Sequence, residues 1–333
     1  MTQRDVRRAG ARSTPPALLT IFALAALCGC SAGHPRDLAP AAAVLRSRHV
    51  VDGEPPVSVS PPGSATFGSY NIHWLDDPSD VRADLARLDS VSVWAFQEAR
   101  SSPADRRNGS PSRVVNVLPP GTWHLAWVPL NRLTEIRSED DEGQVIASRH
   151  PIRSAEVWEL KTDGDKRRVA LAAILDVDGR AVRFVNTDHE PSIVSLARGN
   201  VRQTGSLIEA LGRCEAAGPM PTVVGGDFNT SGCLMRLVSG NADCAELRKR
   251  MTAAGFDEAV VRKVGARTYR SPLYSGTLDH LFVRRASTIA SGVDERATGS
   301  DHLPVWCRVD VHGAPNSPAG GTSAVAGIVK PTR

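Results

Sequence analysis

Histidine follows aspartate at three places in this chain, and two of these pairs lie close together near its end. They are Asp279-His280 and Asp301-His302. A histidine that donates a hydrogen bond to a carboxylate has its tautomer fixed and its protonated form stabilised, which suits proton transfer at neutral pH. The repeated pairs suggest acid–base residues in this part of the sequence, and the surrounding residues must decide their role.

Other polar residues stand at the ends of apolar runs, where a buried strand would carry an apolar side chain. Asn71, Glu98, Asp227, Asn229 and Asp279 are each expected at the end of such a run. A single Asn or Asp in this place is usually a turn residue or a helix cap. Several carboxylates, amides and imidazoles together predict a pocket of hard ligands, which suits Mg²⁺, or Mn²⁺ or Ca²⁺, and not a thiophilic metal.

We expect many short strands and few helices to position these residues, because the sequence contains many apolar runs of strand length. An Asp178-Gly179 step predicts a hairpin. The expected strands are 65–74, 91–99, 123–130, 143–149, 155–161, 169–177, 181–188, 221–228, 276–283 and 304–311, and the expected helices are 78–88, 195–211 and 244–255. Hairpins mixed with helical crossovers predict α/β layers and not a doubly wound parallel sheet. No G-x-G-x-x-G or G-x-x-x-x-G-K-[ST] pattern occurs, so nucleotide folds are unsupported.

Five short segments in fixed order resemble the endonuclease/exonuclease/phosphatase superfamily. They are "SYNIHW", "FQEA", "GGDFN", "TLDHLF" and "GSDHLPV", within residues 64–312. The resemblance implies a four-layer α-β-β-α sandwich, with two mixed β-sheets flanked by helices and a site on loops at one end of the sheets. It also implies a Mg²⁺-dependent phosphoester hydrolase in which water attacks phosphorus.

The same resemblance implies a role for each matching residue. Glu98 resembles the main magnesium ligand, with Asn71 beside it helping to hold metal or phosphate. Asp227 and Asn229 would flank the scissile phosphate, and Asp301 would lie in the metal shell.

His302 would be the catalytic histidine, and Asp279 the carboxylate that hydrogen-bonds it. The Asp of one pair would thus serve the His of the other. His280 should point to the opposite face of its strand and pack there.

One segment departs from the family pattern. Where the family often has Thr-His-Leu, with the His contacting phosphate, this chain has Asp188 in the place of that His and His189 one position later. A shift of one residue turns a side chain to the other face of the sheet unless a bulge restores it. We expect such a bulge before Pro191, and therefore expect His189 to reach the site.

The first residues read as an export signal. Four arginines precede an apolar run at 17–27, which is too short to span a bilayer and typical of a secretory signal core. Leu27 and Gly29 before Cys30 resemble a bacterial lipobox, which predicts a signal peptide over 1–29 and a lipidated Cys30 that anchors the protein to a membrane of the cell envelope. There are two alternatives. The lipidated residue could be Cys28, or a simple signal peptide could be cleaved nearby, which would give a secreted protein.

The rest of the chain reads as one domain between two linkers. Residues 30–63 are rich in Ala, Pro and Ser and predict a tether, and residues 313–333 predict a disordered tail. The catalytic domain is expected at 64–312, as a monomer. The net charge is +4, but without residues 1–29 there are 36 basic and 35 acidic residues, so no strongly basic surface for nucleic acid is indicated. The "KRR" run at 166–168 is expected to be solvated.

Four cysteines fall in the expected domain. In an exported protein an even number favours disulfides. Cys233 and Cys244 would close a short loop, and Cys214–Cys307 follows by elimination.

The substrate stays open at this point. "SRHPI" at 148–152 resembles a stretch frequent in the phosphatase and sphingomyelinase-like branches of the family. A lipid, a small phosphodiester or a nucleic acid are all compatible with the residues, as is an extracellular DNA or RNA endonuclease. A binding lipoprotein without turnover is the alternative from another class.

Overall fold

The computed structural model describes residues 44–53, 61–133, 138–162, 166–191, 198–230, 242–260, 267–271 and 275–312. All of them belong to one compact unit, residues 33–333. The expected signal peptide, Cys30, Cys233 and the expected tail lie outside the described residues. Within the described residues, no helix is both long and apolar enough to cross a membrane.

Two mixed sheets form the centre of the unit. The seven-stranded sheet has the order β1-β4-β5-β3-β2-β15-β14 and the six-stranded sheet the order β10-β13-β9-β8-β7-β6. Only β2–β3 and β8–β9 pair in parallel; all other pairs in these two sheets, over the described residues, are antiparallel. The bounds in the first sheet are β1 Leu45–Val51, β2 Ser64–Asn71, β3 Val93–Ser101, β4 Gly121–Arg132, β5 Asp141–Ser148, β14 Ser287–Val293 and β15 Val305–Asp310. Those in the second are β6 Ile152–Glu159, β7 Val169–Val177, β8 Arg180–Asp188, β9 Thr222–Asp227, β10 Asp257–Glu258 and β13 Asp279–Arg284; β11 (Tyr269–Arg270) and β12 (Ser275–Gly276) pair separately.

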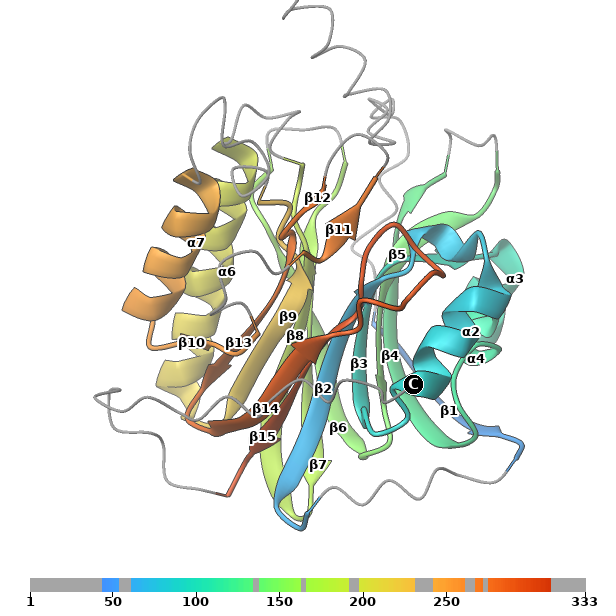
Figure 1. The fold of residues 1–333 in the computed structure, drawn as a ribbon, viewed down its shortest axis with the longest axis horizontal. Coiled ribbons are helices and arrows are strands. Elements are labelled where there is room, and N and C mark those ends of the chain that lie inside the picture. The colour runs from blue at the N-terminus through green and yellow to red at the C-terminus, as the bar shows by residue number, and fades with distance from the viewer. Residues whose placement is uncertain are drawn as a thin grey trace, which may run out of the picture. The chain divides into compact units, whose positions relative to one another are not determined.

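Helices cover the outer face of each sheet (Figure 1). On one side lie α2 (Pro78–Arg87), α3 (Pro103–Asn108) and α4 (Ser112–Val115), and on the other α6 (Arg198–Ala217) and α7 (Ala242–Ala253). One apolar cluster fills the space between the two sheets. A further cluster lies between each sheet and the helices that cover it. This arrangement confirms the α-β-β-α sandwich.

Each parallel pair is joined by a helix, which places the carboxyl ends of its strands at one edge. The first crossover is β2-α2-β3 and the second β8-α6-β9. Helix α2 begins as its sequence predicts: the Asp77 side chain accepts from the Asp80 N–H at 3.2 Å, and Pro78 occupies the first turn. Val81 and Leu85 are buried on its inner face, as the helical period predicts.

The hairpin is confirmed, and the boundary of the tether is corrected. Asp178 and Gly179 join β7 to β8 with φ values of 49° and 85°, the left-handed pair that a two-residue turn of this kind needs. Residues 45–51 were predicted to belong to the tether, but they form β1 and pair with β4 along their whole length. The sheet therefore begins before residue 64.

The prediction of a Cys214–Cys307 disulfide is wrong, since both thiols are free. Cys307 lies in β15 among the side chains between the two sheets. Cys214 lies in α6, on the outer face of the six-stranded sheet, so a sheet separates the two thiols. Cys244 is disulfide-bonded, as predicted, while its predicted partner Cys233 is outside the described residues.

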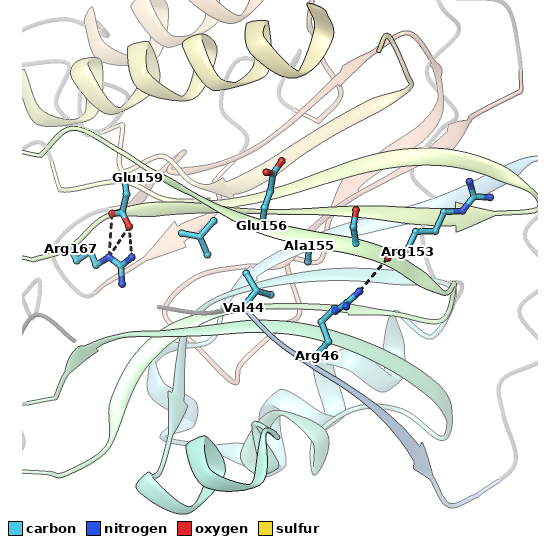
Figure 2. Close-up of a pocket in the computed structure, with 9 residues that line it drawn as sticks. Val44, Arg46, Arg153, Ala155, Glu156, Glu159 and Arg167 are labelled. Carbon is cyan, nitrogen blue, oxygen red and sulfur yellow. Dashed lines mark hydrogen bonds and ion pairs between the residues drawn. The ribbon is translucent and has the colours of Figure 1, made fainter. Parts of the chain in front are cut away.

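A groove of about 640 Å³ lies between the edge strands β1 and β6 (Figure 2). Arg46 donates to the Arg153 carbonyl across it at 3.2 Å. Arg167 pairs with Glu159 at one end. None of the residues predicted for catalysis or metal binding lines this groove.

Candidate active site

The predicted residues meet at one edge of the two sheets, although not all at strand ends. Asn71 ends β2 and Asp227 ends β9. Asp279 was read as the end of a strand, but it begins β13, where it pairs opposite Asp227. His302 likewise precedes β15. Because β13 and β15 run antiparallel to β9 and β2, their first residues reach the same edge.

His302 is held by Asp279, as predicted. Its Nδ1 lies 2.9 Å from Asp279 Oδ2, and its Nε2 lies 3.7 Å from Asp227 Oδ2. Burial opposes the charged ring, but the charges of Asp279 and Asp227 outweigh it and raise the pKa of His302 well above its usual value. The edge of the imidazole also meets the ring of Tyr269, with centroids 4.9 Å apart. The protonated form of the histidine is therefore favoured, and the ring is fixed in orientation.

Asn71 joins two carboxylates beside this pair. Its Nδ2 donates to Glu98 Oε1 at 3.1 Å and to Asp227 Oδ2 at 3.2 Å. Its Oδ1 accepts from the His73 N–H at 3.1 Å. Since the amide uses both of its hydrogens on the carboxylates, Asn71 positions Glu98 and Asp227.

The backbone is distorted where these side chains leave their strands. Glu98 has φ = 51°, and the pairing of β3 with β5 shifts between Phe96 and Ala99. Asn229 has φ = 49°. The left-handed backbone conformation is strained for residues other than glycine, and strained residues of this kind are often found at functional sites. At Gly226 a Cβ atom would lie 1.9 Å from the Thr187 carbonyl oxygen, so the strand before Asp227 requires glycine there.

A third carboxylate that we did not predict completes the group. Asp188 ends β8 and pairs in register with Asp227. It lies on the same face of β8 as Asn186, which contacts Gln97 of the facing sheet at 2.7 Å. The Arg168 Nη1 donates to Asp188 Oδ2 at 2.7 Å.

The three carboxylates raise one another's pKa. Burial comes first, and the neighbouring charges add to it: the pKa of Glu98 rises to about 6, helped by Asp188. Burial and the charges of Asp227 and Glu142 raise that of Asp188 to about 7, against the opposing charge of Arg168. The pKa of Asp227 also rises to about 7, through burial and the charges of Asp279 and Glu98, although His302 opposes the rise.

These donors fit a hard divalent cation. Three carboxylates that repel one another lose that repulsion when a cation binds between them. Asp279 Oδ1 is in addition buried without a hydrogen-bond partner among the described residues. Asp227, Asp279 and His302 also place three ligand atoms within 4.8 Å of one another. The carboxylates of Glu98 and Asp227, which the Asn71 amide positions, are further candidate ligands beside this group.

The structure does not bring His189 to this group. Its ring packs edge-on against Phe228, with centroids 4.8 Å apart, on the helix-covered face of the six-stranded sheet. Neither ring nitrogen has a hydrogen-bond partner within the described part of the chain, and burial lowers its pKa to about 3. The expected bulge is absent, since β8 pairs with β9 in unbroken register up to Asp188. The residue at the site is therefore Asp188.

The remaining predicted residues lie close by in supporting positions. The Asn229 N–H donates to Asp227 Oδ1 at 2.8 Å, and its Nδ2 donates to the His189 carbonyl at 2.7 Å. Asp301 accepts from the Ser300 hydroxyl at 3.3 Å, and its charge contributes to the raised pKa of His302. His280 is buried between Glu258 and Thr230, at 2.7 and 3.0 Å, which confirms a packing role.

The "KRR" run was also misread as solvated. Lys166 pairs with Glu142 at 3.0 Å, and Arg167 and Arg168 pair with Glu159 and Asp188. A run of three cations just before β7, beside the polar end of β8, is the signal that could have placed Lys166 and Arg168 near the site.

A family model described as "Endonuclease/Exonuclease/phosphatase family" matches residues 68–302. The chain belongs to this family. No curated protein sequence matches the chain. Membership confirms the resemblance on which the assignment of the site residues was based.

Solved structures share the family's fold at low sequence identity. An endonuclease/exonuclease/phosphatase family protein from Leptotrichia buccalis is 15% identical, with a TM-score of 0.55, covering 73% of this chain and 98% of the other. The human Nocturnin catalytic domain with bound sulfate is 15% identical, with a TM-score of 0.54, covering 79% and 97%. D. rerio TDP2, complexed with a single-strand DNA product, is 16% identical, with a TM-score of 0.52, covering 74% and 98%. At these identities the likeness concerns the fold.

Proposed function

We propose that this protein is a divalent-metal-dependent phosphoester hydrolase. The observation that carries the proposal is the position of the His302–Asp279 pair, 3.7 Å from Asp227, in a group of carboxylates with raised pKa. A protonated imidazole beside oxygen ligands for a cation is what the hydrolysis of a phosphoester requires.

Each side chain has a distinct part in this reaction. Glu98 and Asp227, which the Asn71 amide positions, would hold Mg²⁺, or Mn²⁺ or Ca²⁺, which when bound stabilises the negative charge that develops on the phosphoryl oxygens. Asp279 fixes the imidazole and keeps it charged. His302 then donates from Nε2 to a phosphoryl or leaving-group oxygen.

Asp227 is our candidate for accepting the proton of the attacking water. It lies beside the histidine, with Oδ2 3.7 Å from His302 Nε2, within the group where the phosphoester would react. The Asn229 N–H and the Asn71 amide hold one oxygen each, so the carboxylate is fixed in place.

For the substrate we propose a phosphodiester, in a lipid, a small molecule or a nucleic acid. The structure of D. rerio TDP2 with a single-strand DNA product supports the nuclease alternative. The nearly balanced charge of the chain after residue 29 argues against a tight non-specific nucleic-acid binder. We further propose that the protein is exported and anchored to the cell envelope through Cys30.

The proposal is tested by turnover with and without metal. Bis-p-nitrophenyl phosphate, p-nitrophenyl phosphate and plasmid DNA are offered to the purified protein with Mg²⁺, then with EDTA, then with Mg²⁺ restored. We expect hydrolysis of at least one diester that stops with EDTA and returns with Mg²⁺. Preference for plasmid DNA would identify the nuclease alternative.

A folded protein without any turnover would contradict the proposal. If the folded protein hydrolyses none of the three with Mg²⁺, Mn²⁺ or Ca²⁺, the hydrolase proposal is contradicted. The alternative of a binding lipoprotein on this fold would then take its place.

A further inference from the structure

A cation and a carboxylate lie together where strands β7 and β8 meet the site. Arg168 directly precedes β7, and Asp188 is the last residue of β8, its antiparallel neighbour. The two side chains are about one-tenth exposed, 11% and 12%, and are joined at 2.7 Å. An ion pair in so little water is held in a defined orientation and is only weakly screened.

This pair belongs to the electrostatics of the site. Asp188 stands opposite Asp227 in the β8–β9 register, and its charge reaches Glu98, whose pKa it helps to raise. The charge of Arg168 opposes the rise in the pKa of Asp188 and also reaches His189. The guanidinium therefore lies beside the carboxylates that would hold the metal.

A phosphoester that enters this group of carboxylates needs hydrogen-bond donors. The amide of Asn71 is used on Glu98 and Asp227, and that of Asn229 on the His189 carbonyl. Lys166 is paired with Glu142. Arg168 and His302 each carry a positive charge next to a carboxylate of this group, at 2.7 Å from Asp188 and 3.7 Å from Asp227.

We propose that the guanidinium of Arg168, oriented by Asp188, binds a phosphoryl oxygen of the substrate. This inference rests on the proposed function, which it deepens by naming a substrate-binding residue. A guanidinium carries five N–H donors in a planar fork that matches phosphate oxygens, and it stays charged at every relevant pH. It would thus act at the strand end where the family pattern has a histidine and this chain has Asp188.

Binding of inorganic phosphate in the presence of Mg²⁺ tests the inference without requiring turnover. Calorimetry is performed on the wild type, Arg168→Ala, Arg168→Lys and the control Arg167→Ala. Arg167 is the neighbouring cation, but it pairs with Glu159 in the groove of Figure 2. Thermal unfolding of each variant establishes that it is folded.

We expect Arg168→Ala to weaken phosphate binding about tenfold to a hundredfold, the worth of a charge-assisted hydrogen bond. Arg168→Lys restores part of the affinity, guanidinium ion added to Arg168→Ala restores more, and Arg167→Ala binds as the wild type does. In turnover assays KM for bis-p-nitrophenyl phosphate rises with the phosphate Kd. If folded Arg168→Ala binds phosphate like the wild type, or if the wild type binds no phosphate, the inference is overturned.

The part played by Asp188 is tested by a double-mutant comparison. A positioning residue acts through its partner, so Asp188→Asn should weaken phosphate binding only when Arg168 is present. An equal effect of Asp188→Asn in the Arg168→Ala background would overturn this role. A wild type that binds phosphate through Arg168 but hydrolyses no ester would contradict the proposed function and leave the inference standing.

Discussion

At the scale of single residues, the site is decided by which face of a strand each side chain occupies. The pairing of Asp279 with His302 was predictable, because the resemblance names both and neither depends on an exact register. The choice between Asp188 and His189 was not, because it turns on one residue of register. The unbroken β8–β9 pairing and the contact of Asn186 with Gln97 put Asp188 on the inner face. A strand pattern alone contains no information about whether a bulge intervenes.

The raised pKa values of the carboxylates predict how metal binding depends on pH. A carboxyl group whose pKa is higher in the folded than in the unfolded state favours folding as pH falls toward the unfolded value. Glu98, at about 6, and Asp227, at about 7, therefore make the metal-free protein less stable at pH 8 than at pH 6, as far as these groups contribute. A cation requires the ionised forms, so Mg²⁺ should raise the melting temperature more at pH 8 than at pH 6.

Thermal unfolding with Mg²⁺ and with EDTA at both pH values measures this difference. Glu98→Gln and Asp227→Asn should each reduce the Mg²⁺ effect at pH 8. A Mg²⁺ effect that is equal at both pH values, or larger at pH 6, would contradict the assignment of the cation to these carboxylates.

At the scale of elements, the helix α2 holds the segment that carries His302. Asp84, fully buried in α2, accepts from the Tyr70 hydroxyl at 2.7 Å and from the N–H groups of Thr298 and Gly299 at 3.1 and 2.8 Å. A Cβ atom at Gly299 would lie 2.4 Å from the Val81 nitrogen, so the segment runs directly against the helix. The amphipathic period of α2 was visible in the sequence. Its buried aspartate was not recognised, because two of its partners, Thr298 and Gly299, lie more than two hundred residues away.

Asp84→Asn is expected to impair both stability and turnover. The amide replaces one acceptor oxygen by a donor opposite backbone N–H groups, which should cost about 1–3 kcal/mol of unfolding free energy. The displaced segment should lower kcat more than it changes KM, because it moves His302. Asp89→Asn, an exposed aspartate just beyond the helix, is the control. Denaturant unfolding and steady-state kinetics measure both effects, and unchanged kcat in Asp84→Asn would rule out the positioning role.

The elements themselves were predicted unevenly, and for physical reasons. Central strands such as β9 and β13 are continuous apolar runs and were found, since both of their faces are buried. The edge strand β1 was assigned to the tether because only alternate residues are partly buried and three of its seven residues are Arg or His. That Asp279 begins a strand depends on whether its neighbour is parallel, which only the sheet topology shows.

At the scale of the whole molecule, the proposed location depends on Cys30, which lies outside the described residues. We propose that its acylation holds the hydrolase at a membrane, because lipid chains bury in the bilayer and supply an anchor that no described helix provides. The sequence order of basic residues, apolar run and cysteine supports this proposal.

Replacement of Cys30 should release the protein. In a bacterial host, the full chain should fractionate with membranes and require detergent, whereas Cys30→Ser should be found in the soluble fraction. Cys28→Ser is the matched control and should stay with the membranes. Retention of Cys30→Ser on membranes, or release of Cys28→Ser, would contradict lipidation at Cys30.

We propose that His302, held by Asp279, acts on a phosphoester in a metal-dependent reaction. The most direct measurement is kcat for bis-p-nitrophenyl phosphate with Mg²⁺, compared among the wild type, His302→Ala, Asp279→Asn and His312→Ala, an exposed histidine. We predict a fall of about 100- to 10,000-fold for His302→Ala, a smaller fall for Asp279→Asn, and none for His312→Ala, with all four proteins folded. Activity of folded His302→Ala within a few-fold of the wild type would contradict this role of His302.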